Sequence, residues 1–368
     1  MFENWLRPLP ADFSDSEQYE PHQLGRHLSV FGEGGLPPLR EGQLALLGIG
    51  DKEADAVRRE LYAMSFSFPG LNIADLGNVR RKSISFMLHP IRELFQSGIF
   101  PVLIGGAPSF TLAQYQAFLS LRSLISLVLV DERIRLSPQP GEEAGAFLNE
   151  LIHQERSQLF HLGFIGAQTH YTAPDTFRFL EQRNFDCIRL GRARSAIAEL
   201  EPIIRDGDLL SLNLAALKQL EAPAVGDPTP SGFFVEEACQ ISRYGGMSDK
   251  LKSFGVFGYR HALDRRRQTA RAVAQILWYF IDGFYHRKQD YPVSTEGLTE
   301  YIVDFKKMDY QLTFWKSQKS GRWWMQVPVK TAEPYQRHRL IPCSYNDYRL
   351  ACQEELPERL LNAYKRFA

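Results

Sequence analysis

The sequence has no excess of charge of either sign, because 43 Lys and Arg residues balance 43 Asp and Glu residues over its 368 positions. A balanced chain has no overall electrostatic attraction to nucleic acid or to an acidic membrane surface. It contains no apolar run near the roughly 20 residues that cross a bilayer. Residues 1–21 also lack the basic start and apolar segment of a signal peptide. We therefore expect neither nucleic acid nor a membrane as a partner.

Cysteine is scarce, and its spacing argues against two kinds of site. None of the cysteines belongs to a CxxC pair, so the sequence predicts neither a zinc ribbon nor a dithiol redox motif. Reduced, mostly buried thiols are typical of a cytoplasmic protein, and we expect this location. The four positions are Cys187, Cys239, Cys343 and Cys352.

Several well-known catalytic motifs are also missing. The nine histidines show neither HExxH nor HxH spacing, and the chain has no GxSxG segment. The sequence therefore indicates neither a histidine-based metal site nor a hydrolase nucleophile elbow. Gly48 and Gly50 stand between an apolar run and a helical pattern, but the third glycine of a dinucleotide fingerprint is absent. This stretch is typical of an ordinary strand-to-helix turn.

The sequence does contain a regular alternation of apolar runs and helical patterns. Runs that are apolar on both faces and alternate with helices predict a parallel sheet covered on two sides. We expect a three-layer α/β/α sandwich over residues 43–285, with a mostly parallel sheet of about eight strands, preceded by an N-terminal arm over residues 1–42. The predicted strands lie in 43–50, 70–79, 99–106, 124–132, 160–168, 185–191, 207–214 and 251–259.

This pattern breaks near residue 286. Aromatic-rich alternating segments around Ser320 and Gly321 predict a hairpin, and residues 346–367 have helical spacing. We expect residues 286–368 to form an extension that packs on the domain or at a subunit contact. Trp323 and Trp324 stand among basic residues, but with zero net charge we prefer a packing or subunit-contact role to stacking on single-stranded nucleic acid.

One strand end has an unusual charge pattern. The segment VLVDERIRL, residues 128–136, runs from a buried-strand pattern straight into Asp131, Arg133 and Arg135. The carboxyl end of a parallel strand is where a metal ligand or a catalytic base is expected. Two arginines at this edge therefore need an explanation.

Four segments, taken in chain order, resemble the ureohydrolase family of arginase, agmatinase and formimidoylglutamase, and the formimidoylglutamase branch is the most similar. LIGGAPSFTLAQYQA stands where the family has GGDHS, and VLVDERIRL where it has DAHxD. LLSLNLAALKQLEAPAVGDPTPSGFFVEEA is similar to its SxDxDxxDP segment. FGVFGYRHALDRRRQTARAVAQILWYFIDGF is similar to its last strand and helix. The resemblance covers residues 43–284 and implies an arginase-like fold that assembles into trimers or hexamers.

The resemblance also implies a chemistry. The family holds two Mn²⁺ ions with six ligands: the His of GGDHS, the Asp-His-Asp of DAHxD and the two Asp of SxDxD. The ions hold a hydroxide that attacks a guanidinium or formimino carbon. Only one of the six ligands is retained in this chain. Ala107 replaces the Asp before the GGDHS histidine, and Gly258 replaces an acidic residue of the last-strand loop. The six ligand positions hold Pro108, Asp131, Arg133, Arg135, Asn213 and Ala215.

Because arginine keeps its charge and is no metal ligand, we expect no metal, no catalytic residue and no dinuclear manganese site. Two readings of the arginines remain. In one, Arg133 forms a relict salt bridge with Asp131 inside a closed pocket. In the other, the pocket is open and Arg133 and Arg135 bind a small anion such as a carboxylate or phosphate.

The first function hypothesis is therefore a catalytically inactive ureohydrolase-fold protein with a binding or scaffolding role. We expect it to form a homo-oligomer and to bind a protein partner or a small anionic ligand. One alternative is a hydrolase of linear amidine C–N bonds, such as that of formimidoylglutamate or a guanidino compound, with a displaced metal site. Another is a metal-free anion sensor that uses Arg133 and Arg135.

Overall fold

The computed structural model describes residues 2–121, 124–136, 147–153, 158–306, 310–328 and 339–367. These residues form a ten-stranded sheet in the order β1-β4-β3-β5-β10-β9-β6-β7-β8, with β2 also paired to β4. Every pairing is parallel except that of β1 with β4. The strands are β1 Leu6–Arg7, β2 Ser29–Val30, β3 Leu44–Gly48, β4 Ile73–Val79, β5 Phe100–Ile104, β6 Ile125–Val130, β7 Leu159–Ala167, β8 Asp186–Arg189, β9 Leu209–Asn213 and β10 Ser253–Phe257.

The prediction of a mostly parallel sheet is confirmed, and its eight expected strands are β3 to β10. The sequence reading missed β1 and β2, which come from the segment expected to be an arm. Each has only two residues, which is too short to show a period-two or continuous apolar pattern.

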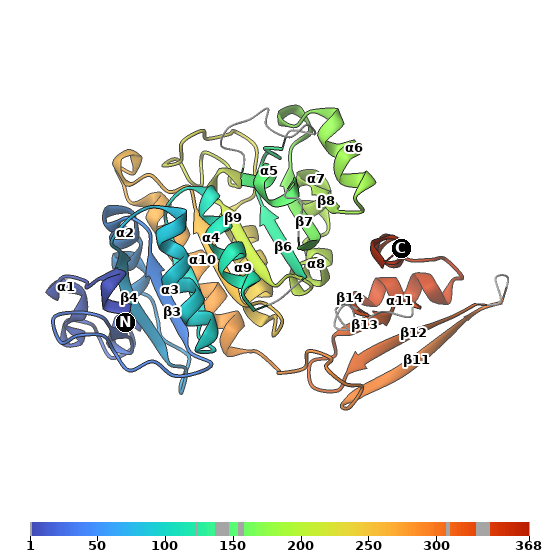
Figure 1. Cartoon of the computed structure of the whole chain (residues 1–368), viewed down its shortest axis with the longest axis horizontal. Coiled ribbons are helices and arrows are strands. Elements are labelled where there is room, and N and C mark those ends of the chain that lie inside the picture. The colour runs from blue at the N-terminus through green and yellow to red at the C-terminus, as the bar shows by residue number, and fades with distance from the viewer. Residues whose placement is uncertain are drawn as a thin grey trace.

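Helices cover both faces of this sheet (Figure 1). Alternate residues of β3 show why: Leu44 and Leu46 belong to one hydrophobic core, and Ala45 and Leu47 belong to the other. The first core includes α2, α9 and α10, and the second includes α3, α4 and α6. The helices are α1 Ala11–Ser14, α2 Asp51–Tyr62, α3 Ile84–Gln96, α4 Thr111–Leu119, α5 Phe147–Ile152, α6 Pro174–Gln182, α7 Leu190–Ser195, α8 Glu201–Arg205, α9 Val235–Met247 and α10 Gln268–Tyr285.

The C-terminal extension is larger than the predicted hairpin. The strands β11 Leu298–Phe305, β12 Tyr310–Ser317, β13 Trp323–Gln326 and β14 Leu340–Cys343 form a four-stranded antiparallel sheet in chain order. The hairpin expected around Ser320 and Gly321 joins β12 to β13. Two helices, α11 Tyr345–Cys352 and α12 Glu358–Phe367, complete a separate hydrophobic core that contains Phe314 and Met325. The extension lies beside the large sheet in Figure 1.

A buried arginine joins the extension to the large domain. Arg205 at the end of α8 donates from Nη2 to the carbonyl oxygens of Trp323 and Cys343, at 3.1 and 3.3 Å. Its guanidinium lies 4.4 Å from the ring centre of Trp324. Trp323 and Trp324 are both buried, so in this structure they pack within the chain.

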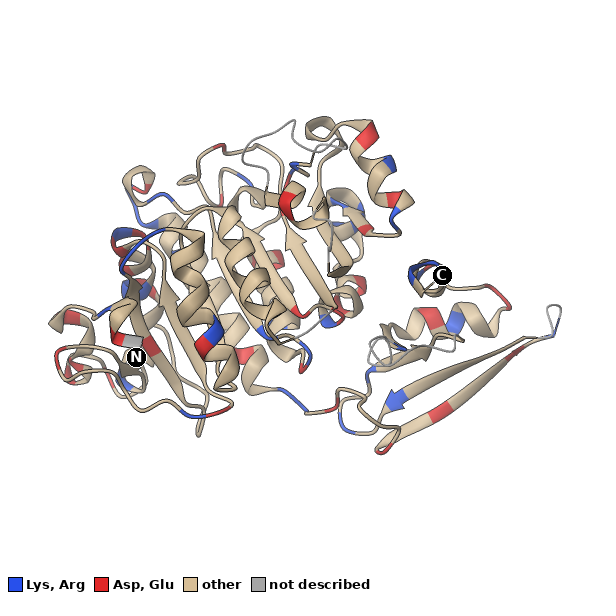
Figure 2. Cartoon of the chain, in the orientation of Figure 1, with Lys and Arg blue, Asp and Glu red and all other residues tan. Residues whose placement is uncertain are grey.

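Two further features agree with the composition. Figure 2 shows Lys and Arg interspersed with Asp and Glu along the chain, as the balanced charge requires. Among the described residues, no helix has both the length and the apolar character that a membrane crossing demands.

Candidate functional site

The residues singled out from the sequence meet at one edge of the sheet. The strands β5, β10, β9 and β6 are consecutive neighbours in the sheet, and all four run parallel. Their carboxyl ends therefore lie at the same edge, where a parallel sheet presents its ligand-binding loops. Each of the six former ligand positions lines one of two cavities at this edge: Pro108, Asp131, Arg133, Arg135, Asn213 and Ala215.

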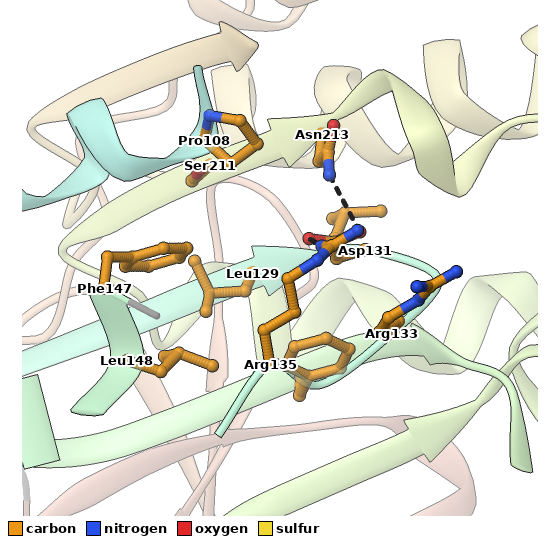
Figure 3. A pocket seen from close by; sticks show the side chains of 11 residues that line it. Pro108, Leu129, Asp131, Arg133, Arg135, Phe147, Leu148, Ser211 and Asn213 are labelled. Carbon is orange, nitrogen blue, oxygen red and sulfur yellow. Dashed lines mark hydrogen bonds and ion pairs between the residues drawn. The ribbon is translucent and has the colours of Figure 1, made fainter. Parts of the chain in front are cut away.

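The smaller cavity has a volume of about 10 Å³, which is room for one water molecule. Pro108, Asp131 and Asn213 line it together with apolar side chains that include Leu129 and Phe147. Figure 3 shows this arrangement, with Arg135 reaching over the carboxyl group of Asp131. The space directly beside Asp131 is thus largely filled by protein atoms.

Asp131 receives hydrogen bonds on both carboxyl oxygens. Its Oδ1 accepts from Asn213 Nδ2 at 2.9 Å and from the backbone N–H of Glu132 at 2.8 Å. Its Oδ2 accepts from Arg135 Nη1 at 3.2 Å. Burial raises the pKa of Asp131 well above its ordinary value, and the neighbouring Glu132 raises it further. Arg135 and Asn213 act in the opposite direction and favour the charged form.

Glu132 is the second carboxyl group of this cluster, and its side chain is fully buried. Arg135 Nη2 donates to Glu132 Oε1 at 2.8 Å. The other oxygen, Oε2, has no hydrogen-bond partner among the residues that the structure describes. One arginine whose side chain is 37% exposed therefore serves two buried acidic residues. The sequence reading missed Glu132 because the family motif has alanine there.

The expected salt bridge between Arg133 and Asp131 is wrong, because Arg135 takes that place. The chain leaves β6 after Val130 and bends at Glu132 and Arg133, so the residue four positions after Asp131 returns over it. Arg133 instead pairs through Nη2 with Asp227 at 3.0 Å, and its Nε lies 3.5 Å from Glu132 Oε1. Its guanidinium lies 4.8 Å from the ring centre of Tyr171.

The interpretation with the Arg133–Asp131 salt bridge also expected a closed pocket, and the pocket is open. A second cavity of about 640 Å³ lies over the same strand ends. Small residues form part of its wall, including Ala107, Ala215 and Gly258, at positions where the resemblance expects acidic residues. Small residues at these positions take up less volume than acidic side chains would, which adds to this space.

Four charged residues of the larger cavity were missed from the sequence. They are Glu53, Lys82, Asp227 and Arg260. Glu53, Lys82 and Arg260 follow β3, β4 and β10, whose carboxyl ends all point to this edge. A list of the charged residues that follow each predicted parallel strand would have found these three, whereas Asp227 comes from a longer connection.

This set of side chains does not fit a pair of divalent metal ions. Hard divalent ions need several carboxylate or imidazole ligands, but Arg133, Arg135 and Asn213 direct N–H groups into this region. In the described parts of the chain, no three His, Cys, Asp or Glu side chains come together as a metal-binding group. The residues at these strand ends therefore do not suit a dinuclear metal site.

The fold and the position of its cavity define an α/β protein of the arginase type. A model of the arginase family matches residues 51–282. This match covers more than half of the chain, and the chain belongs to the arginase family.

Relatives with assigned functions point to one branch of the family. Formimidoylglutamase from Bacillus subtilis (strain 168) is 21% identical over 193 residues, which cover 50% of this chain and 60% of the relative. The match thus spans less than two thirds of that relative's length. Formimidoylglutamase from Geobacillus thermodenitrificans (strain NG80-2) is 23% identical over 253 residues, which cover 60% of this chain and 76% of the relative.

Solved structures agree on the fold. Trypanosoma cruzi formiminoglutamase with Mn²⁺ superposes with a TM-score of 0.59 and 15% identity, over 67% of this chain and 94% of that one. The Bacillus subtilis formimidoylglutamase structure gives a TM-score of 0.59 and 18% identity, over 68% of this chain and 89% of that one. At this level of identity the likeness concerns the fold alone.

Proposed function

We propose that this chain is a member of the arginase family that does not hydrolyse amidines and acts by binding. The observation that carries the proposal is that N–H groups already occupy the carboxyl oxygens of Asp131, which stands at the one retained ligand position of six. Both of its oxygens accept hydrogen bonds from N–H groups, which belong to Asn213, Glu132 and Arg135. A metal ion at Asp131 would have to displace these donors.

Electrostatics supports the same proposal. A divalent ion near Asp131 would lie close to the fixed positive charge of Arg135, whose Nη1 is 3.2 Å from Asp131 Oδ2. Arginine does not lose its proton to relieve such a contact. At 4 Å, each unit charge pair costs about 4 kcal/mol at the effective dielectric of a protein surface. Glu132 offers some compensation, but it is already paired with Arg135.

The test is the metal content of the protein together with its hydrolytic activity. The untagged protein is loaded with Mn²⁺, passed through a desalting column and measured by plasma mass spectrometry. It is then assayed for release of formamide, ammonia or urea from formimidoylglutamate, agmatine and arginine. Bacillus subtilis formimidoylglutamase, treated in the same way, is the positive control for the formimidoylglutamate assay.

We expect near-zero metal per chain and no turnover. Two metal ions per chain with turnover would contradict the proposal and favour the alternative, a hydrolase of linear amidines with a displaced metal site. The observation that keeps this alternative in view is the cavity of about 640 Å³ over the strand ends. It is lined partly by charged side chains, and its volume suits a small molecule.

The same cavity supports a second candidate, in which the chain is a metal-free sensor of a small anion. In the first form of this idea, Arg133 and Arg135 bind the anion. Both arginines already have acidic partners, Asp227 for Arg133 and Asp131 and Glu132 for Arg135. Anion binding by these two residues would have to break those ion pairs, which weakens this form of the idea.

Two further proposals concern assembly and location. We propose that the chain forms a homo-oligomer in the cytoplasm, on the basis of the family resemblance and of its unpaired cysteines, of which Cys239 and Cys343 are buried. Light scattering after size-exclusion chromatography measures the first, and cell fractionation measures the second. A monomer at micromolar concentration, or a protein found outside the cytoplasm, would refute the respective proposal.

A further inference from the structure

The charged side chains around the larger cavity are matched in pairs, with one exception. Lys82 lies 3.4 Å from Glu53. Asp227 pairs with Arg133 at 3.0 Å. Arg135 pairs with two buried carboxyl groups. The exception is Arg260, whose side chain makes no hydrogen bond or ion pair with any residue that the structure describes.

The backbone of Arg260 is anchored beside the cavity, and its side chain is exposed. The N–H of Arg260 donates to the carbonyl oxygen of Ala224 at 2.9 Å. Its guanidinium lies next to Gly226: a Cβ on that glycine would come within 2.6 to 2.9 Å of three guanidinium atoms. Gly226 and Arg260 both line the cavity. The absence of a side chain at residue 226 therefore makes room for a cation at the cavity wall.

The rest of the wall is largely apolar. Ile49, Ala107, Phe110, Phe147, Ala215 and Val225 line the cavity. One unpaired guanidinium beside such a surface suits a ligand with a single negative charge and an apolar body. A doubly charged phosphate would leave one charge without a partner, unless it also broke the Lys82–Glu53 pair.

We propose that this cavity binds a small organic monocarboxylate, with its carboxylate on Arg260 and its apolar body against Phe110, Phe147 and Val225. The proposal rests on the proposed function, because it assumes that no metal ion occupies the strand ends. In this proposal Arg260 contacts the anion, and Arg133 and Arg135 do not. Lys82 is 56% exposed and loosely paired, so it adds attraction at the cavity mouth without a fixed contact.

Titration calorimetry with four probes tests the ligand class. Benzoate has the charge and the apolar ring, benzamide has the ring without the charge, acetate has the charge without the ring, and inorganic phosphate has more than one charge. We expect benzoate to bind at least about tenfold more tightly than the other three. Equal binding of benzamide, tighter binding of phosphate, or no benzoate binding at millimolar concentration would overturn the proposal.

Three variants locate the binding. Arg260→Ala removes the guanidinium, and we expect a loss of benzoate affinity of about tenfold or more. Arg265→Ala removes an exposed arginine of the same loop that does not line the cavity, and is expected to bind like the unchanged protein. Gly226→Ala keeps the charge but displaces it, so benzoate affinity is expected to fall while folding, measured by urea unfolding, is retained.

Unchanged affinity in Arg260→Ala, or an equal loss in Arg265→Ala, would refute the site.

The metal content of the same protein batch separates the carboxylate site from the proposed non-hydrolytic function. A metal-free protein that ignores benzoate refutes the carboxylate site and leaves the non-hydrolytic function standing. A protein that holds two metal ions and hydrolyses an amidine refutes the proposed function.

Discussion

Two clusters of charged side chains in this protein differ in how many of their charged atoms have a hydrogen-bond or ion-pair partner. In the first, Arg58 of α2 is fully buried, and its guanidinium makes five hydrogen bonds to acceptors on Asp55, Asp75, Gly77 and Asn78. In the second, after β6, Arg135 is partly exposed and one oxygen of Glu132 has no hydrogen-bond partner in the described structure.

This difference separates a cluster that joins two structural elements from the cluster at the candidate site. The Arg58 cluster ties α2 to β4, and Tyr62 donates a further hydrogen bond to Asp75. Burial lowers the pKa of Arg58, but the ion pair with Asp75 more than offsets this and leaves it raised. At the β6 cluster, burial dominates instead and raises the pKa of Asp131. In the Arg58 cluster the guanidinium is fully hydrogen-bonded, as expected of a cluster that stabilises the fold. In the β6 cluster Oε2 of Glu132 has no hydrogen-bond partner among the described residues.

The largest effect is expected from Arg58→Ala. It leaves Asp75 buried without its cation, and breaking a buried pair in this way costs about 3–5 kcal/mol. Urea unfolding measures the loss. Arg59→Ala is the matched control, because Arg59 is 52% exposed and pairs with Asp12 at the surface, where such a pair contributes about 0–1 kcal/mol. Equal losses in the two variants would contradict the structural role of the Arg58 cluster.

A smaller loss is expected from Arg135→Ala. Asp131 and Glu132 lose their shared cation, but Glu132 keeps Arg133 Nε at 3.5 Å. Arg135 is also partly exposed, so water can reach the vacated space. We expect a loss of about 1–3 kcal/mol at neutral pH, measured by urea unfolding. The loss should shrink in acid, because protonated carboxyl groups no longer need the cation. A loss as large as that of Arg58→Ala would show that the two clusters are equivalent.

The pH dependence of stability sharpens the comparison further. The pKa of Asp131 is raised by folding from its ordinary value of 3.8, so the folded state holds its proton more firmly than the unfolded state. Its contribution to stability is therefore full below pH 3.8 and is lost as the pH rises toward the folded pKa. The slope is at most about 1.4 kcal/mol per pH unit.

Asp131→Asn removes this titration. The stability of the variant minus that of the unchanged protein, from urea unfolding at pH 4 to 7, is therefore expected to rise with pH. Subtraction cancels the other titrating groups, such as Asp186, whose pKa is lowered, despite its burial, by the hydrogen bond and charge of His161. A flat difference, or one that falls with pH, would show that Asp131 is fully ionised in the folded protein.

The smallest effect is expected from Arg133→Ala. Arg133 is 29% exposed and its partner Asp227 is 66% exposed, so their ion pair contributes about 0–1 kcal/mol. Arg133 Nε also lies 3.5 Å from Glu132 Oε1, but Arg135 is nearer to that oxygen, at 2.8 Å, and stays in place in this variant. Urea unfolding should show almost no change. A loss above that of Arg135→Ala would mean that the cluster is organised around Arg133, as in one of the two interpretations of the sequence.

Much of the fold could be predicted from the sequence, because the residue pattern of each strand is visible within a short segment. β6 and β9 are apolar on both faces because each face packs against a helix layer, so their patterns were visible without any tertiary information. The four-stranded sheet of the extension was harder. Only the β12–β13 hairpin around Gly321 carries a turn signal, and β14 has four residues.

The candidate site was predicted in its location but not in its contacts. Parallel strands bring Pro108, Asp131 and Asn213 to one edge, so their proximity followed from the order of motifs along the chain. Which arginine meets Asp131 depended on the bend after Val130, and no residue pattern encodes such a bend. The role of Arg260 depended on Gly226, which lies 34 positions earlier in the chain.

Residue identity and spacing were enough to predict the parallel sheet and the family, because both follow from local patterns and the order of motifs. They also predict that five of the six positions matched to metal ligands hold other residue types. The folded chain was needed to show that Arg135 is the arginine that pairs with Asp131 and that a cavity of about 640 Å³ is present. It was also needed to show that Arg260 has no partner in the described part of the chain. The physical reason is that ion pairing and empty volume depend on distances of a few ångströms between segments far apart in sequence, and these distances exist only in the folded chain.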